Sequence, residues 1–306
     1  MEDKLCIVQF PHPGNETHPK SCVYVKWNLS KTHKRKYLCC TGNYMKNGIE
    51  VRDRLMFWGE WEPDSYIIRD YGINNSPRYL QKPIWPCEIP ISTKCCGTDP
   101  FVFNNEFLYG ICKQTKRLSK TKNHSITQLA RLQIGSLILF GSTLNQNTPN
   151  ACFAVDTIFV VSDYVEYDDS SIDYVQGSVR EQDYTLIAQL NGVETEKRRC
   201  YKGATPKNPY YGMYSFCPCV IYNSEGVGHE RLILDKNIIR NINKMLPKDV
   251  LNPNLNSSPK YNPTIINEED DEKKESLTIQ NVRTVWNELR RLTFEQGLLE
   301  GTRFYL

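Results

Sequence analysis

Hydrophobic and polar positions alternate in short runs over the first two thirds of the chain, and this pattern predicts β-strands. The runs are rich in β-branched and aromatic residues and are bounded by Gly, Pro, Asn or Ser. Strands are predicted over residues 5–10, 36–41, 54–62, 107–112, 136–141, 152–161 and 213–222. We therefore expect an α+β fold with a β-rich body and bracing helices.

Helical periodicity is found in four segments. Residues 124–132 and 179–190 predict short helices, and residues 232–246 predict a longer one. The last segment has apolar residues at helical spacing, followed by Gly301 just past its end. These residues are Ile279, Val282, Val285, Trp286, Leu289, Leu292 and Leu299. They predict an amphipathic C-terminal helix.

Residues 247–276 differ in composition from the rest of the chain. Asn, Pro and Ser come first, and a mixed-charge run follows at residues 268–275. Too few apolar side chains are present to offset the entropy of ordering this segment, so a flexible linker is expected. The predicted organisation is a β-rich body over residues 1–246 with one barrel or two sub-barrels, a linker over 247–276, and a C-terminal helix over 277–306 that packs on the body.

Length and charge set broad limits. A chain of 306 residues can bury a full hydrophobic core, and a net charge of +3 is too small to imply nucleic-acid binding by itself. The start of the chain is acidic and lacks the apolar core of a secretory signal, and no run approaches the length of a membrane span. We expect a cytoplasmic protein that does not bind membranes.

Twelve cysteines are scattered along the chain. No Cys-x-x-Cys spacing occurs, and the adjacent pairs cannot easily chelate one tetrahedral ion. We therefore expect reduced thiols that serve as small core residues. Neither a metal nor a cofactor is expected.

Two stretches in the middle of the chain resemble a known family. Residues 132–141 read as a helix end, a glycine and an apolar strand, and residues 153–161 as a second apolar strand. This arrangement resembles PUA-like domains, including the ASCH and EVE groups. The resemblance implies a small β-barrel that binds RNA or modified bases.

A second resemblance rests on four short motifs. These are His12-Pro13-Gly14, the basic run at residues 33–37, the segment at residues 58–63 and the segment at residues 98–103. Together they are similar to a family of uncharacterised bacterial proteins. The resemblance implies a bacterial origin and supplies no activity.

The densest candidate chemistry lies between residues 57 and 63. Trp58 and Glu60 share one face of an extended chain, while Trp61 and Glu62 follow at once. A rigid aromatic ring beside a carboxylate suits a planar, hydrogen-bonding ligand such as a base. The alternative is a half-buried strand whose indoles fill a core and whose glutamates face water.

Histidines and basic residues near the N-terminus supply further candidates. His12 lies in a turn-rich segment, where it could move protons or bind a metal, or simply be hydrogen-bonded. Alternation places His33, Arg35 and Tyr37 on one face, where an arginine beside an aromatic ring could hold a phosphate and a base. Lys36 points to the other face. The alternative is an edge strand that its charges keep soluble.

Four more polar residues are candidates for ligand binding or for a structural contact. Asp99 caps a turn or reaches a ligand. Lys202 and Thr205 lie in a small-residue loop that could bind phosphate, although the spacing is not that of a Walker loop. Asp156 interrupts an apolar run, and a carboxylate there needs a partner. We expect Asp156 to be a paired structural carboxylate rather than a catalytic one.

Three classes of function stay open. The first is a module that binds a nucleotide or nucleic-acid base. Its stacking residues would be Trp58, Tyr37 or Trp61, its orienting residues Glu60 or Asp99, and its phosphate ligands His33, Arg35, Lys36, Lys202 and Thr205. The second is an enzyme acting on a nucleotide or nucleic acid, with Glu60 or Glu62 as general base and His12 or His33 as acid. The third is a scaffold whose C-terminal helix binds a partner.

Overall fold

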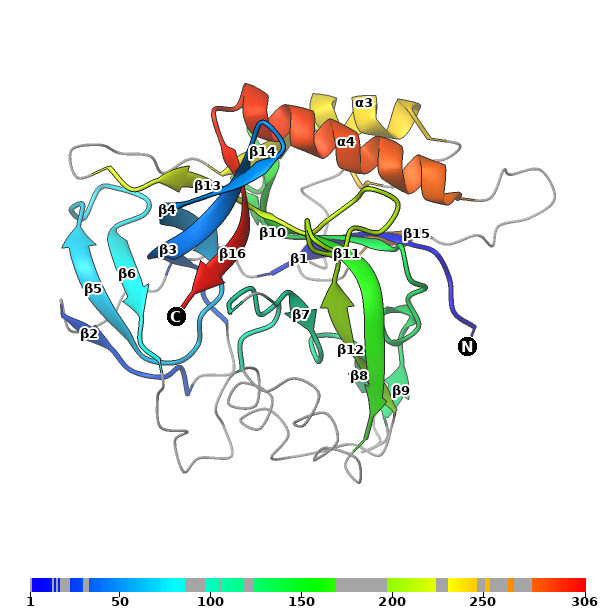
Figure 1. Ribbon diagram of the computed structural model, residues 1–306, viewed down its shortest axis with the longest axis horizontal. Helices are drawn as coiled ribbons and strands as arrows, with labels where there is room; N and C mark the ends of the chain where they lie inside the picture. The colour runs from blue at the N-terminus through cyan, green and yellow to red at the C-terminus, as the bar shows by residue number, and fades with distance from the viewer. Residues whose placement is uncertain are drawn as a thin grey trace.

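The structure is a computed structural model that describes residues 2–12, 14, 16, 23–29, 33–85, 97–104, 106–117, 124–168, 197–223, 231–246, 251–253, 264–266 and 277–306. Two large β-sheets and two α-helices make up most of this part of the chain (Figure 1). The predicted strand-rich α+β class is therefore confirmed.

The first sheet is mixed. In spatial order it contains β15 (Thr264–Ile266), β1 (Ile7–Pro11), β10 (Leu137–Leu144), β11 (Cys152–Tyr167), β12 (Arg198–Gly203) and β7 (Leu108–Tyr109), while β14 (Leu232–Asp235) also pairs with β11. β1 and β10 are parallel, and the other pairs are antiparallel. The central strands β1 and β10 are almost wholly apolar, as expected of strands covered on both faces.

The second sheet contains a closed ring of strands. Its order is β16 (Leu299–Tyr305), β13 (Cys217–Ile221), β4 (Ile49–Gly59), β3 (Lys36–Lys46), β6 (Tyr79–Pro83), β5 (Ser65–Asp70) and β2 (Tyr24–Val25). β16 also pairs with β3, beside which it runs in Figure 1, so β3, β4, β13 and β16 close on themselves. β3 and β4 form a hairpin whose turn residues, Asn47 and Gly48, have φ of 50° and 80°, as a type I′ turn requires.

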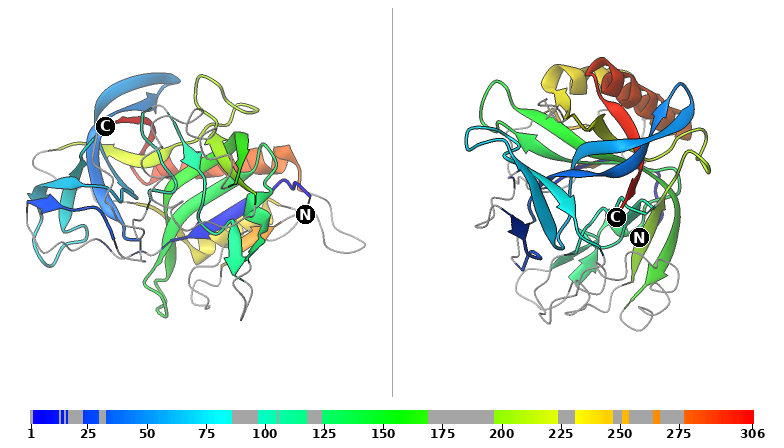
Figure 2. Two further views of the ribbon diagram at one scale, coloured as in Figure 1. Left: turned by 90° about the horizontal axis from the view of Figure 1, so that it is seen from below. Right: turned by 60° about the vertical axis from the view of Figure 1, so that its left-hand side comes forward.

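Two helices begin at clear capping residues. α3 (Lys236–Lys244) follows Asp235, whose carboxylate accepts the N–H groups of Asn237 and Ile238. α4 (Ile279–Glu295) begins after Thr278, which forms a reciprocal capping box with Asn281. The helices lie side by side along one side of the molecule in Figure 1 and in the right-hand view of Figure 2.

The core has two main parts, which lie on opposite faces of the first sheet. Residues such as Ile7 and Leu139 pack with the buried faces of α3 and α4. Their neighbours in the strands, such as Val8 and Phe140, pack instead against Phe57 and other residues of the second sheet. The first sheet is therefore covered by helices on one face and by the second sheet on the other.

Several predicted elements differ from the structure. The helix expected over residues 124–132 is the strand β9 (His124–Ile126), paired with β8 (Thr115–Arg117), followed by a short 3₁₀ helix (Gln128–Ala130). Residues 232–246 begin with strand β14, and the C-terminal segment ends with strand β16. The helix expected over residues 179–190 lies outside the described residues.

The predicted linker is also only partly described. β15 pairs with β1, Leu251 is buried, and the N–H of Asn252 donates to the side chain of Gln9 at 2.9 Å. These stretches are packed, so the expectation of an unpacked linker does not hold for them. The mixed-charge run lies outside the described residues.

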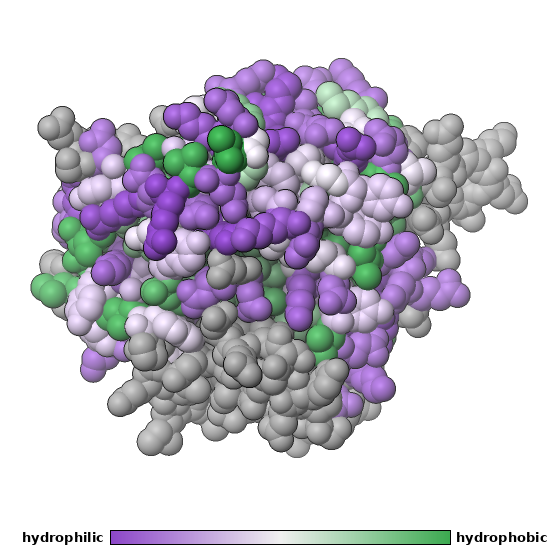
Figure 3. Space-filling view, viewed as in Figure 1, coloured by the Kyte–Doolittle hydropathy of each residue, from purple (hydrophilic) through white to green (hydrophobic). Residues whose placement is uncertain are grey.

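The surface shown in Figure 3 carries its hydrophobic residues in small groups separated by polar ones. On α4, Val282, Val285, Trp286 and Leu289 are buried in the core, so its apolar face is already occupied. Neither of the helices seen in the structure is both long and apolar enough to cross a membrane.

Candidate active site

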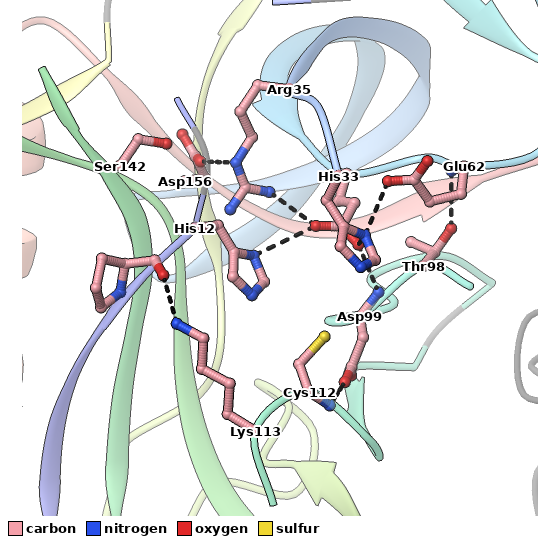
Figure 4. Close-up of polar contacts among 12 residues, drawn as sticks. His12, His33, Arg35, Glu62, Thr98, Asp99, Cys112, Lys113, Ser142 and Asp156 are labelled. Carbon is pink, nitrogen blue, oxygen red and sulfur yellow. Dashed lines mark hydrogen bonds and ion pairs between the residues drawn. The ribbon is translucent and has the colours of Figure 1, made fainter. Parts of the chain in front are cut away.

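Charged and imidazole side chains from distant parts of the sequence meet between the two sheets (Figure 4). His12 follows the end of β1, and Arg35 directly precedes β3. Glu60 directly follows β4, whose last residue is Gly59. These side chains are almost wholly buried, since His12, Arg35 and Glu60 are 4%, 2% and 1% exposed. Three residues that the sequence nominated separately therefore share one site.

Glu60 lies at the centre of this cluster. Its Oε1 is 2.9 Å from His33 Nδ1 and accepts the backbone N–H of Asp99 at 3.2 Å. Its Oε2 is 3.3 Å from His12 Nδ1 and 3.4 Å from Arg35 Nη1. A carboxylate with nitrogen atoms on both oxygens is fixed in position and stabilised in its ionised form.

His33 links Glu60 to a second carboxylate. Its Nδ1 is also 3.0 Å from Glu62 Oε1. The position of Glu62 is fixed by its backbone N–H, which donates to the Thr98 hydroxyl at 3.1 Å. The donor atoms of His33, Glu60 and Glu62 all lie within 4.8 Å of one another, so these three residues could hold a metal ion.

His12 is the one imidazole of the cluster that lacks a hydrogen-bond partner among the described residues. Its backbone N–H donates to the carbonyl of Gly141 at 2.7 Å, which positions the residue against β10. Its Nδ1 approaches Glu60, but the angle is not that of a hydrogen bond, and neither ring nitrogen has a partner in the described residues. The rings of His12 and His33 are parallel to within 11°, with centroids 6.2 Å apart.

Asp156 extends the cluster away from Glu60. The pairing of β10 with β11 shifts between Phe140 and Gly141, which leaves Asp156 as the extra residue of a bulge. Its carboxylate lies 3.1 Å from Arg35 Nε and 2.6 Å from Arg231 Nη2. The expectation that this carboxylate has a structural partner is confirmed, because it binds two buried arginines.

Burial and neighbouring charges shift the pKa values within the cluster. Burial lowers the pKa of His12 to about 4, and the charge of Arg35 adds to this effect. The charge of Glu60 raises the pKa of His33 to about 12. Burial tends to raise the pKa of Glu60, but the charge of His33 and the close approach of both imidazoles hold it well below its usual range.

Asp99 and Lys36 have structural contacts beside the cluster. The Asp99 carboxylate accepts the backbone N–H groups of Gly110, Ile111 and Cys112 at 2.9, 2.9 and 2.6 Å. It therefore caps the turn at residues 110–112. Burial raises the pKa of Asp99 to about 6. Lys36 donates to the carbonyl of Pro63 at 3.3 Å, and burial lowers its pKa to about 8.

The aromatic residues nominated for base stacking are buried. Trp61 is fully buried, and its indole N–H donates to the Asp64 carbonyl at 2.8 Å. Tyr37 is 1% exposed and contacts Trp58 at a centroid distance of 5.4 Å. A ring without exposed surface cannot stack on a base unless its neighbours move, so we assign Tyr37 and Trp61 to the core.

Trp58 occupies an intermediate position. It is 4% exposed, yet it lines a cavity of 640 Å³ together with Gly14, Arg231 and Gln296. The guanidinium of Arg231 lies 4.9 Å from the centre of its ring. Arg231 thus belongs both to the wall of the cavity and to the buried cluster.

Lys202 and Thr205 lie elsewhere. They line a different cavity of 680 Å³, bounded also by Glu106, Lys207 and Tyr210. None of the cluster's residues lines it. The structure therefore does not bring these two residues to the site of His12 and Glu60.

Sequence reasoning did not place Arg231 or Lys113 at this site. Arg231 has no motif around it, and only the need of Asp156 for a buried cation hints at such a residue. Lys113 donates to the carbonyl of Pro11, the residue before His12, at 3.1 Å (Figure 4). No signal in the sequence indicates that contact.

Comparison of the chain with models of protein families, with curated proteins and with solved structures finds no match. The function is therefore inferred from the geometry of the cluster.

Proposed function

We propose that the protein is an enzyme that hydrolyses a phosphate ester in a nucleotide or nucleic acid, with His12 and Glu60 as its acid–base pair. The observation that carries this proposal is the approach of an unpartnered, buried imidazole to a buried carboxylate, 3.3 Å apart. A histidine oriented by a carboxylate is a common arrangement for moving protons in enzymes. His33 binds the other carboxylate oxygen and holds Glu60 in place.

In this reaction His12 accepts a proton from water. The water oxygen forms a bond to phosphorus, and the bond from phosphorus to the leaving oxygen breaks. The proton then passes from His12 to the leaving oxygen, which restores the neutral imidazole. Glu60 stabilises the imidazolium that forms in between.

Two buried arginines support an anionic substrate. Arg35 Nη2 and Arg231 Nε have no hydrogen-bond partner among the described residues. Such donors suit a phosphate group, which arginine binds through several N–H groups. The cavity beside Arg231 and Trp58 gives a ligand room next to the cluster, and His33, 23% exposed, connects the cluster to solvent.

The resemblance to PUA-like domains adds a smaller amount of support for a nucleotide or nucleic-acid substrate. The closed ring of β3, β4, β13 and β16 supports a small barrel of the PUA-like kind. The stretches that carry the resemblance, however, form β10 and β11 in the other sheet. The nucleotide assignment rests mainly on the arginines.

The proposal is tested by incubating the protein with a panel of nucleotides and of single- and double-stranded nucleic acids, with products identified by mass spectrometry. Glu60→Gln and His12→Gln should each lower turnover by roughly 10²–10⁴-fold while substrate binding persists. Glu300→Gln is the matched control, because Glu300 is also a buried carboxylate paired with an arginine, Arg290. The proposal fails if no substrate is hydrolysed, or if Glu60→Gln and Glu300→Gln reduce turnover equally.

A further inference from the structure

Three donor atoms converge on one side of Glu60. His33 Nδ1 is 2.9 Å from Glu60 Oε1 and 3.0 Å from Glu62 Oε1. Ligand atoms about 2.1 Å from one cation lie about 3.0 Å apart when they occupy adjacent octahedral positions. The imidazole nitrogen therefore has the spacing of an adjacent ligand to each carboxylate oxygen, and all three ligand atoms lie within 4.8 Å of one another.

One shared proton on His33 satisfies the two facing carboxylates less well than a cation would. Glu60 and Glu62 are 1% and 2% exposed, and both face the same ring nitrogen. A single N–H can donate with good geometry to one oxygen, and His33 Nδ1 forms its hydrogen bond with Glu62 Oε1 at 3.0 Å. Glu60 Oε1 then keeps one hydrogen bond, from the backbone N–H of Asp99 at 3.2 Å. Arg35 approaches Glu60 at the opposite oxygen, Oε2, so its guanidinium does not occupy the space between the three donors.

His12 provides a second, independent observation. Its side chain is 4% exposed, its Nδ1 lies 3.3 Å from Oε2 of the same carboxylate, and neither ring nitrogen has a hydrogen-bond partner among the described residues. A buried polar group in this state indicates a missing ligand atom or water. Water bound to a cation beside Glu60 is a suitable partner for it.

We propose that His33, Glu60 and Glu62 bind a divalent transition-metal ion, beside the carboxylate that His12 also approaches. An imidazole with two carboxylates suits ions such as Mn²⁺, Fe²⁺ or Zn²⁺. Three protein ligands with positions left for water are typical of catalytic rather than structural metal sites. The role given to the ion rests on the proposed function: the ion binds the water whose proton His12 accepts.

The test measures binding of Mn²⁺ to the full-length protein after treatment with a chelator. Mn²⁺ is the probe because the free thiols of the chain compete for Zn²⁺. The loss of the free Mn²⁺ signal in electron paramagnetic resonance gives affinity and stoichiometry, and elemental analysis checks the latter. We expect about one ion per chain.

Glu62→Gln and His33→Asn should weaken Mn²⁺ binding at least tenfold, because each removes a ligand. Glu166→Gln, which changes a carboxylate on β11 outside the cluster, should bind as the wild type does. Circular dichroism shows whether each variant is folded. If a ligand variant does not fold, the Mn²⁺ titration of the wild type alone tests whether the site binds metal. Binding of less than about 0.1 ion per chain at about 1 mM Mn²⁺, or unchanged binding in both folded ligand variants, overturns the inference.

Failure of the metal site and failure of the proposed function give different results. Turnover that persists in chelator and is lost in Glu60→Gln, without Mn²⁺ binding, removes the metal and leaves the acid–base proposal. Stoichiometric Mn²⁺ binding without hydrolysis of any substrate in the panel supports the metal site and removes the hydrolase.

Discussion

His12 and Glu60 meet with 3.3 Å between Nδ1 and Oε2, although each belongs to a different sheet. His12 follows β1 in the first sheet, and Glu60 follows β4 in the second. Their contact forms only when the two sheets are packed together. The site is therefore a product of tertiary structure, and changes that loosen the sheets should also disturb it.

Asp156→Asn should be strongly destabilising. The Asp156 carboxylate is 1% exposed and binds both Arg35 and Arg231, so its loss leaves the buried Arg231 without its counter-charge and Arg35 with Glu60 alone. Breaking a buried pair in this way costs about 3–5 kcal/mol of unfolding free energy, which urea denaturation measures.

The control is Asp163→Asn, which makes the same chemical change at an exposed position in the same strand. It should change the unfolding free energy by less than about 0.5 kcal/mol. Equal, small effects of the two substitutions would show that Asp156 is not needed to neutralise the arginines.

Trp58→Ala should cost about 3–5 kcal/mol of unfolding free energy. The ring is 4% exposed and packs against Tyr37 and the guanidinium of Arg231. Tyr211→Ala, which truncates an aromatic ring that is 62% exposed, should have little effect in the same urea assay. If Trp58→Ala has the unfolding free energy of the wild type, the ring is not a core residue and is instead available for stacking on a ligand.

Much of the strand content could be predicted because alternation and β-branched residues mark half-buried strands. β14 was missed because Leu232 and Leu234 continue the apolar pattern of α3, and a short apolar run does not distinguish strand from helix. β16 was missed because Leu299 also fits the helical spacing of α4. β15 lies in a segment whose composition indicates no packing at all.

The site was predictable residue by residue but not as an assembly. His12, His33 and Glu60 could be nominated from their types, yet their convergence depends on how the sheets pack. The side-chain direction of Asp156 depends on a bulge that has no signal in the sequence. Trp61 illustrates the opposite error, since an indole beside carboxylates fits a core position as well as a binding surface.

The closed ring of strands should be sensitive to added volume at Gly42. A Cβ at this position would lie 2.4 Å from the carbonyl oxygen of Arg303 in β16 and 2.8 Å from the Leu55 side chain. Gly42→Ala therefore forces β3 and β16 apart and should cost about 1–3 kcal/mol in urea denaturation. Thr41→Ala, at the exposed neighbouring position, is the control and should leave stability nearly unchanged. If Gly42→Ala is equally harmless, the close approach of the two strands is not required.

Buried thiols should make the folded state sensitive to alkaline pH. Burial raises the pKa of Cys217, Cys219 and Cys200 above that of an ordinary thiol. The folded state keeps these protons while the unfolded state loses them above about pH 8.5, so the unfolded state binds fewer protons there. The unfolding free energy therefore falls as pH rises, by up to about 1.4 kcal/mol per pH unit for each thiol.

Replacing one such thiol should remove its share of this pH dependence. We expect the unfolding free energy of Cys217→Ala to fall less steeply than that of the wild type, by about 1.4 kcal/mol per unit between about pH 9 and 10. Lys36 and Lys113 act in the opposite direction, because burial lowers the pKa of each to about 8, but both are present in the two proteins and cancel in the comparison. Urea denaturation in the presence of a reducing agent measures the slopes, and Val220→Ala, which also truncates a side chain of β13, should keep the wild-type slope. Equal slopes for all three proteins would mean that the Cys217 thiol ionises as readily in the folded state as in the unfolded chain.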